Sequence, residues 1–277
     1  MRRITASKFI AAILAGAPSA IYGGSRNAAP ARTLVVTAHE YSFQLPDSVP
    51  AGVVTVRLVN RGKNAHQLTF ARLDDTSSVD RVMRSLIANK ARTGGIRWVG
   101  GVESAIPGES GEATLPLASG RYVIVCAYEG DHGLTHMSLG MIRSLVVTPG
   151  APVTTQSLPP TPATIELSEY HIGISSPLHS GRQLVRVVNV GKQRHHLVIG
   201  RIVGNATTDE IMKWDGKSQP APLADMSGGS AAMDPGQAAV IDMNLAPGRY
   251  ELACVLSDSG KSSPHYLLGM HQEVAAR

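Results

Sequence analysis

The sequence predicts an all-β protein made of two Greek-key β-sandwich domains, each with one short helix. Three observations support this fold class. The chain repeats itself at a spacing of 129 residues, apolar and polar residues alternate with a period of two in most segments, and 28 glycines with 17 prolines provide frequent turns. A hydrophobic content of 43% with only 17% charged residues is typical of globular chains that bury a core.

The repeat is clearest in two segments that align without a gap. EYSFQLPDSVPAGVVTVRLVNRGKNAHQLTFARL begins at residue 40, and EYHIGISSPLHSGRQLVRVVNVGKQRHHLVIGRI begins at residue 169. After small slips in register, four residues with metal-binding chemistry also align between the copies. They are His66, Cys126, His136 and Met141 in the first copy and His195, Cys254, His265 and Met270 in the second.

The two copies predict two domains joined by a linker. The segment TPGAPVTTQSLPPTPAT, rich in Pro and Thr, lies between the copies and is typical of a semi-extended connection. We therefore expect a signal peptide and N-terminal tail at 1–31, a first domain at 32–148, a linker at 149–162 and a second domain at 163–277.

Each copy is expected to consist mainly of strands. In VVTVRLVN, which starts at Val53, every second residue is apolar, so one face of a strand is suited to a core. Further strands are expected at 33–37, 67–72, 112–117, 121–127 and 141–147. One helix is expected from Val79, where VDRVMRSLIANK places its apolar residues on one stripe, and the second copy begins its helix with a capping box at Thr207.

The N-terminal segment MRRITASKFIAAILAGAPSAIYGG predicts a secretory signal. Arg2, Arg3 and Lys8 precede a short apolar run and a group of small residues. Because no stretch approaches the roughly 20 apolar residues of a membrane span, we expect no integral membrane segment and a periplasmic or secreted protein. Removing these three charges reduces the formal charge from +5 to +2, so we expect no nucleic-acid partner.

The aligned residues supply a thiol, two imidazoles and a thioether. Soft sulfur favours Cu(I) and imidazole accepts either oxidation state of copper, so this donor set suits copper in electron transfer. His66 lies near the start of a predicted strand, while Cys126, His136 and Met141 come from one later loop. All four can therefore meet at one end of a β-sandwich.

Each half resembles a cupredoxin, the blue-copper fold of plastocyanin and azurin. The resemblance rests on the segments NRGKNAH and NVGKQRH, on a GRY turn that leads to Cys, and on HMSLGM and HYLLGM downstream. It covers nearly all of 33–147 and 163–275. It implies one copper ion per domain, cycling between Cu(I) and Cu(II), and a redox partner protein. The implied ligands are His66, Cys126, His136 and Met141, and in the second domain His195, Cys254, His265 and Met270.

One feature departs from small blue-copper proteins, which separate Cys from the second His by only a few residues. Nine residues lie between Cys126 and His136, and ten lie between Cys254 and His265. His132 is nearer to Cys126 but has no counterpart in the second copy, so we prefer His136 as the ligand.

Other interpretations stay open for these residues. The two cysteines can form a disulfide, remain buried thiols or bind metal as thiolates. The histidines can be satisfied at strand starts, and the methionines can fill gaps in the core. His196 is expected to face away from its neighbour His195. Besides an electron carrier, the chain can be a copper storage or delivery protein that exchanges copper with a donor or acceptor, or a metal-free interaction module.

The sequence also predicts that the protein is not an enzyme. Multicopper oxidases and copper nitrite reductases resemble tandem cupredoxins but carry His-x-His and His-Cys-His runs, and neither run occurs here. The chain also lacks a Gly-x-Ser-x-Gly elbow, a phosphate-binding glycine loop and a zinc-protease helix.

Overall fold

The computed structural model describes residues 32–277 apart from 89–92, 131–132, 215–217, 227 and 258–262. The expected signal peptide and His132 lie outside the described residues. Residues 31–277 cluster into one compact unit. No helix among the described residues is long and apolar enough to cross a membrane.

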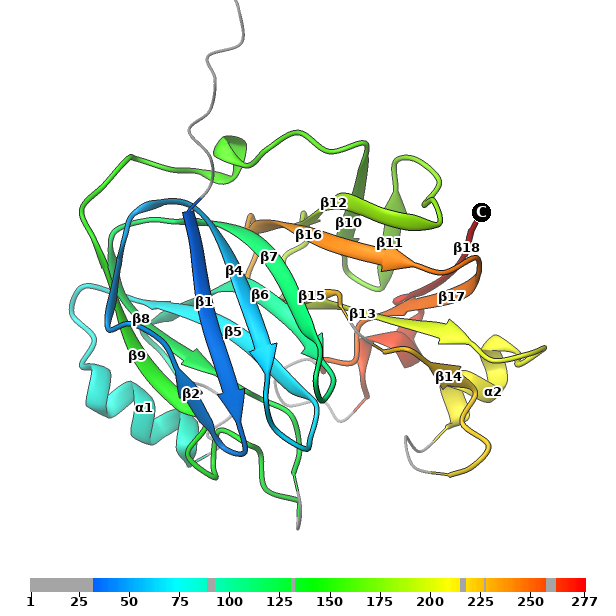
Figure 1. Cartoon of the computed structure of the whole chain (residues 1–277), viewed down its shortest axis with the longest axis horizontal. Helices are drawn as coiled ribbons and strands as arrows, with labels where there is room; N and C mark the ends of the chain where they lie inside the picture. The colour runs from blue at the N-terminus through cyan, green and yellow to red at the C-terminus, as the bar shows by residue number, and fades with distance from the viewer. Residues whose placement is uncertain (1–31, 89–92, 131–132, 215–217, 227, 258–262) are drawn as a thin grey trace, which may run out of the picture. The chain divides into compact units, whose positions relative to one another are not determined.

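The described residues are mostly in strands, which confirms the expected all-β class (Figure 1). The first repeat contains β1 (Arg32–His39), β2 (Ser42–Gln44), β3 (Ser48–Pro50), β4 (Gly52–Asn60), β5 (His66–Leu73), β6 (Ile96–Ala105), β7 (Ser110–Leu117), β8 (Gly120–Val125) and β9 (Ile142–Thr148). The second contains β10 (Ala163–Ser168), β11 (His171–Ile174), β12 (Gly181–Asn189), β13 (His195–Ile202), β14 (Leu223–Ala224), β15 (Ser230–Met233), β16 (Ala238–Leu245), β17 (Gly248–Ala253) and β18 (His271–Ala276).

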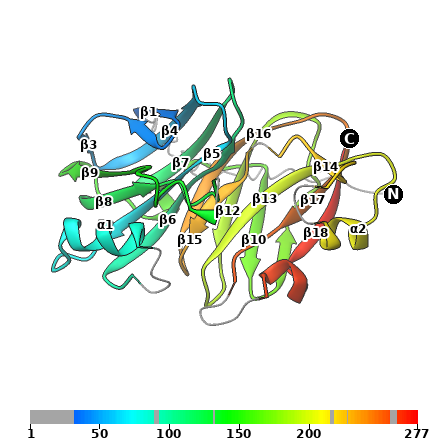
Figure 2. The ribbon, with the colours of Figure 1, turned by 90° about the horizontal axis from the view of Figure 1, so that it is seen from below.

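Both sheets run through both repeats. One has the strand order β11-β10-β12-β16-β7-β4-β1-β2, and the other has the order β18-β17-β13-β15-β6-β5-β8-β9-β3. The repeats meet where β16 pairs with β7 and where β15 pairs with β6, and Figure 2 shows β15 between β6 and β13. The division into two domains therefore stays a prediction, because the sheets continue across the boundary between the repeats.

In each sheet, the strands of the second repeat follow nearly the same order outward from the junction as the equivalent strands of the first repeat. At one junction Ala113 pairs with Ile241, and at the other Val102 pairs with Ser230. Each of these pairs joins residues 128 positions apart, which is the spacing that aligns the GRY turns of the two copies. Equivalent residues thus face each other, and the repeats are related by an approximate two-fold axis that passes through both junctions.

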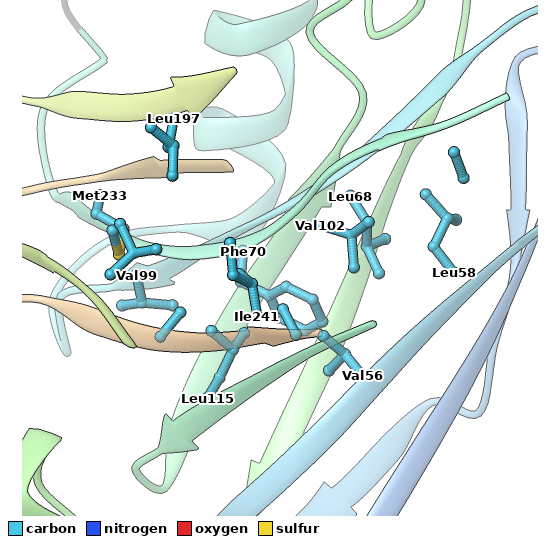
Figure 3. Packing of buried hydrophobic residues seen from close by; sticks show 14 of the residues in the cluster. Val56, Leu58, Leu68, Phe70, Val99, Val102, Leu115, Leu197, Met233 and Ile241 are labelled. Atoms are coloured by element: carbon cyan, nitrogen blue, oxygen red, sulfur yellow. The ribbon is translucent and has the colours of Figure 1, made fainter. Parts of the chain in front are cut away.

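One hydrophobic core extends between the two sheets and across both repeats. Figure 3 shows part of it, where side chains of the first repeat such as Phe70 and Leu115 lie near Met233 and Ile241 of the second. Strand β6 is buried on both faces over most of its length. Strands β5 and β15 pair with its two edges, and the second repeat packs against it. A strand buried on both faces shows no alternation of apolar and polar residues, so β6 was not among the strands expected from the sequence.

The two helices begin where the sequence indicates. Helix α1 (Val79–Ile87) has Ser78 as its N-cap and buries Val82 and Leu86. Helix α2 (Thr208–Lys213) begins with the capping box formed by Thr207 and Glu210, as expected. Helix α1 ends before the expected residue 90, and residues 89–92 lie outside the described part of the chain.

Candidate metal centre

The turn before the first histidine of each repeat is held by a buried asparagine. The Asn60 side chain donates to the carbonyls of Asn64 (2.7 Å) and Ala105 (2.8 Å), and its oxygen accepts the N–H of Gly62. Asn189 makes the equivalent three bonds in the second repeat. These bonds fix the turn that delivers His66 and His195 to the first positions of β5 and β13.

The long loop after each cysteine is closed at its base by backbone hydrogen bonds. In the first repeat the N–H of His136 bonds to the carbonyl of Tyr128 (2.8 Å), and the N–H of Met137 bonds to that of Cys126 (2.9 Å). Glu129 is bridged to Thr135 next to these bonds. His136 therefore returns beside Cys126 as it would at the end of a short loop.

The second repeat closes its longer loop in the same way. The N–H of His265 bonds to the carbonyl of Leu256 (2.7 Å), and the N–H of Tyr266 bonds to that of Cys254 (2.9 Å). Ser257 is bridged to Pro264 at the equivalent place. The unusual spacing between cysteine and histidine thus does not separate the two side chains.

Each repeat brings two imidazoles and one thiol into a buried group. The Nδ1 atoms of His66 and His136 lie 3.2 Å apart, and the thiol Sγ of Cys126 lies 3.4 Å from Nδ1 of His136. All three residues are buried, and their ligand atoms lie within 4.8 Å of one another.

The second group has nearly the same dimensions. Nδ1 of His195 lies 3.2 Å from Nδ1 of His265, and Sγ of Cys254 lies 3.5 Å from Nδ1 of His265 and 4.0 Å from Nδ1 of His195. The structure therefore brings together His, Cys and His of each repeat. Their role as metal ligands stays a prediction.

Met141 and Met270 are fully buried beside these groups. The N–H of Met141 bonds to the carbonyl of His136 (2.9 Å), and its carbonyl accepts the N–H of Cys126 (3.2 Å). Met270 makes the same two bonds in the second repeat. The loop thus ties each methionine to the histidine and the cysteine of its own repeat, while its role as a ligand stays a prediction.

Burial controls the protonation of the groups. Burial, together with the neighbouring His136, lowers the pKa of His66 to about 4, and burial with His265 lowers that of His195 to about 4. Burial raises the pKa of Cys126 to about 12 and that of Cys254 to about 11. At neutral pH these two imidazoles are therefore neutral and free to donate electron pairs, and both thiols are protonated.

The spacing and chemistry of the donors fit a single ion in each repeat. Bonds of about 2.0–2.3 Å from a transition metal to nitrogen or sulfur place two ligands of one ion less than about 4.4 Å apart. The separations of 3.2–4.0 Å given above meet this condition. Cys126 and Cys254 are both free, so the structure does not contain the disulfide that the sequence left open.

Two further residues border each group and were missed by the sequence analysis. The carboxylate of Glu40 lies 3.9 Å from Nε2 of His66, and the ring of Tyr41 meets that of His136 edge-on at 5.1 Å. The second repeat has the same arrangement. The carboxylate of Glu169 lies 3.6 Å from Nε2 of His195, and the ring of Tyr170 lies 5.6 Å from that of His265. The Glu-Tyr pair recurs in both copies of the sequence, and this recurrence could have indicated that the two residues belong to the site.

A glycine in the same turn leaves space for this carboxylate. A Cβ atom at Gly62 would lie 2.5 Å from Oε1 of Glu40 and 2.8 Å from Nε2 of His66. One at Gly191 would lie 2.7 Å from Oε1 of Glu169. The Asn-x-Gly pattern is thus required by close packing against the carboxylate as well as by turn geometry.

His196 and Glu103 form a second buried contact away from the His-Cys-His groups. His196 is buried but faces away from His195, as expected, and its Nδ1 lies 3.4 Å from the carboxylate of Glu103. Glu103 gives no signal in the repeat, because the equivalent position of the second copy is Ala231.

No protein-family model and no curated protein sequence matches the chain. Among solved structures, the reduced auracyanin of Roseiflexus castenholzii is 21% identical, with a TM-score of 0.31; the match covers 43% of this chain and 98% of auracyanin. The copper-containing nitrite reductase of Thermus scotoductus is 16% identical over 88% of this chain and 61% of its own, with a TM-score of 0.26. The blue copper oxidase of Nitrosomonas europaea is 13% identical over 88% and 86%, with a TM-score of 0.25.

These neighbours agree with the cupredoxin resemblance at the level of fold. They correct the expectation that the protein is not an enzyme, because the structures that match most of this chain include a nitrite reductase and oxidases. That expectation rested on the missing His-x-His and His-Cys-His runs. Such runs feed additional copper atoms, so their absence does not decide whether a chain with other sites turns over a substrate.

Proposed function

We propose that the protein is a copper-binding redox protein with one mononuclear centre in each repeat. His66, Cys126, His136 and Met141 would hold one ion, and His195, Cys254, His265 and Met270 the other. The observation that carries the proposal is the duplicated group of two imidazole Nδ1 atoms and one thiol, nearly identical in both repeats. Thiolate and imidazole together favour copper over the hard cations, which prefer oxygen ligands.

Bound copper would supply a one-electron couple between Cu(I) and Cu(II). The chain's own residues hold the donors in place before an ion arrives, since backbone bonds join Cys126, His136 and Met141 to one another. Burial keeps the first imidazole of each group neutral and excludes water from the donors. A site that is already arranged changes little between oxidation states, and this favours rapid electron transfer.

The cysteine of each group must lose a proton to become a ligand. Because burial raises the pKa of both thiols, ion binding releases this proton, and the affinity for copper rises with pH over the neutral range. The backbone N–H of Gln67 points at Sγ of Cys126 from 3.3 Å and would stabilise the thiolate once it forms.

The redox partner is proposed to be a protein that docks near the second centre. Leu267 and Leu268 lie two and three residues after His265, and 54% and 41% of their surfaces are exposed. Exposed apolar side chains beside a buried ligand provide a dry contact surface close to the ion. We further propose export to the periplasm or the cell exterior, on the basis of the N-terminal sequence.

Copper reconstitution of the purified chain tests the proposal. We expect two copper ions per chain and an intense visible band from thiolate-to-copper charge transfer, which disappears on reduction. Cys126→Ser and Cys254→Ser should each remove one ion and part of the band, and the double variant should remove both.

Three other results would contradict the proposal. A protein that takes up no copper would be a metal-free interaction module. Full occupancy without reversible reduction would instead indicate copper storage or delivery. A Cys254→Ser variant that still binds two ions would place one of the sites elsewhere.

A further inference from the structure

One buried carboxylate lies at the approximate two-fold axis between the repeats. Glu103 is 2% exposed and follows Val102, which pairs with its own equivalent Ser230 across the junction of β6 and β15. The equivalent of Glu103 in the second repeat is Ala231, so the position is occupied by a carboxylate once in the two copies. A residue so near the axis can reach equivalent residues of both repeats.

The Glu103 side chain contacts the residue that follows the first histidine of each group. Its Oε2 accepts a hydrogen bond from the Gln67 amide at 2.7 Å, and Nδ1 of His196 lies 3.4 Å from the same oxygen. The N–H of Val255 donates to Nε2 of His196 at 2.8 Å, so Nε2 carries no proton. In the neutral imidazole Nδ1 is then protonated, and it presents its N–H toward the carboxylate.

Gln67 and His196 also contact the two thiols through their backbones. The N–H of Gln67 bonds to Sγ of Cys126 at 3.3 Å, and the backbone of His196 acts on the Cys254 sulfur in the same sense, lowering the pKa of that thiol. Burial is the main reason that the pKa of each thiol is raised, and the charge of Glu103 adds to the rise in both repeats. A single carboxylate is thus connected to both sulfurs by hydrogen-bonded residues and by its field.

We propose that Glu103 is a shared positioning residue that sets the balance between Cu(II) and Cu(I) at both centres. This inference rests on the proposed function. A negative charge near a metal ion stabilises the more positive oxidation state, so Glu103 favours Cu(II) and lowers the reduction potential of each site. Because burial in the protein weakens solvent screening, one carboxylate acts on both centres.

The test measures the reduction potential of each centre separately in the full chain. Cys254→Ser leaves the first centre and Cys126→Ser leaves the second, and Glu103→Gln is added to each. We expect the affinity ratio of Cu(II) to Cu(I) to fall by about tenfold at both centres, which raises each potential by about 59 mV. A shift at only one centre, or at neither, would overturn the proposal.

Glu251→Gln is the matched control. Glu251 is also a 2% exposed glutamate, but its carboxylate contacts His271 at 3.2 Å. We expect this variant to leave the potential of the first centre unchanged, and an equal shift there would mean that any buried charge has the same effect.

Glu103→Asp covers the case in which Glu103→Gln fails to fold. It keeps the charge but withdraws it from Gln67 and His196 by one methylene, so we expect smaller shifts in the same direction at both centres. Opposite shifts at the two centres would contradict a shared role. A wild-type chain without copper uptake would contradict the proposed function, whereas a loaded chain with unchanged potentials would contradict only the role of Glu103.

Discussion

The two ligand loops hold nearly identical donors in different surroundings. In the first repeat Met137 packs in the cluster beneath α1 with Val82 and Leu86, and the Ser138 hydroxyl donates to the carbonyl of Ile87 at 2.9 Å. In the second repeat the residue equivalent to Ser138 is Leu267, which is exposed. The part of the first loop that follows His136 is thus covered by a helix, while the equivalent part of the second loop presents apolar side chains to solvent.

This difference shows which parts of the fold determine the site. The turn asparagine, the strand that leads to cysteine and the backbone bonds at the loop base recur in both repeats, and the donor distances recur with them. The covering helix does not recur in the same place, yet the donors are unaffected. We infer that the shared backbone network determines the geometry and that the cover determines access to a partner.

Acid should destabilise the metal-free protein equally through both repeats, and this is the largest expected effect. The pKa of His66 and that of His195 fall from 6.5 in the unfolded chain to about 4 in the folded one, so the unfolded state binds more protons between these values. Stability present above pH 6.5 is then lost as the pH falls toward 4, by roughly 3 kcal/mol for each histidine.

Urea unfolding of the copper-free chain at pH 7 and pH 4.5 measures this loss. His66→Gln and His195→Gln should each reduce the pH dependence by about half. A dependence that one variant abolishes alone would show that the two repeats differ in their buried imidazoles.

The turn asparagines should contribute equally in the two repeats. Asn60→Ala removes two donated bonds and one accepted bond from a fully buried position, and Asn189→Ala does the same. We expect each variant to lower the free energy of unfolding by about 3 kcal/mol, because buried backbone groups lose their partners. Chemical denaturation measures both values. Asn→Asp at either position keeps the acceptor for glycine but turns an oxygen toward the two carbonyls, so a loss at least as large as that of the alanine variant is expected.

A smaller and again equal effect is expected from the tyrosines of the GRY turns. The hydroxyl of Tyr122 donates to the carbonyl of Ala118 at 2.8 Å, and that of Tyr250 donates to Ala246 at 2.9 Å. Tyr122→Phe and Tyr250→Phe should each lower the free energy of unfolding by about 1 kcal/mol. Thermal melts of the two variants can be compared directly, and a loss at only one position would break the equivalence of the repeats.

The exposed leucines should separate partner docking from stability. Leu267→Ser introduces the residue that the first repeat carries at the equivalent position, Ser138. We expect a stability change within about 0.5 kcal/mol and unchanged copper content, since the side chain is at the surface. Electron exchange with the proposed redox partner should slow. The control is Val146→Ser, an exposed apolar residue on β9, and equal slowing in both variants would argue against docking at the second loop.

Much of the fold could be predicted because the repeat displays each important residue twice. Strands with one buried face, such as β4, show the alternation that the sequence analysis used. The order of His, Cys and His predicted which side chains the structure brings together, whereas the preference for His136 over His132 as a ligand and the ligand role of the methionines stay predictions. The number of residues between Cys126 and His136 did not reveal how close the two side chains lie, because the bond that closes the loop between Tyr128 and His136 involves only backbone atoms.

The remainder depended on contacts between the repeats. Strands β6 and β15 are buried by the other repeat, so their sequences lack a periodic signal. A glutamate stands at this position in the first copy only, so alignment of the two copies does not single out Glu103. Sequence comparison within the chain finds what the repeats share, whereas the contacts at their junction come from residues in which they differ.

The pairing of equivalent residues at the junction has a consequence for assembly. A single repeat on its own would leave β6 and β7 as open sheet edges, and such edges readily recruit another strand. Ala113 could then pair with Ala113 of a second molecule in the register that it now uses with Ile241. Because the two repeats are joined in one chain, the same pairing is made within a single molecule. Each copy can then carry different residues, so the two halves need not stay equal.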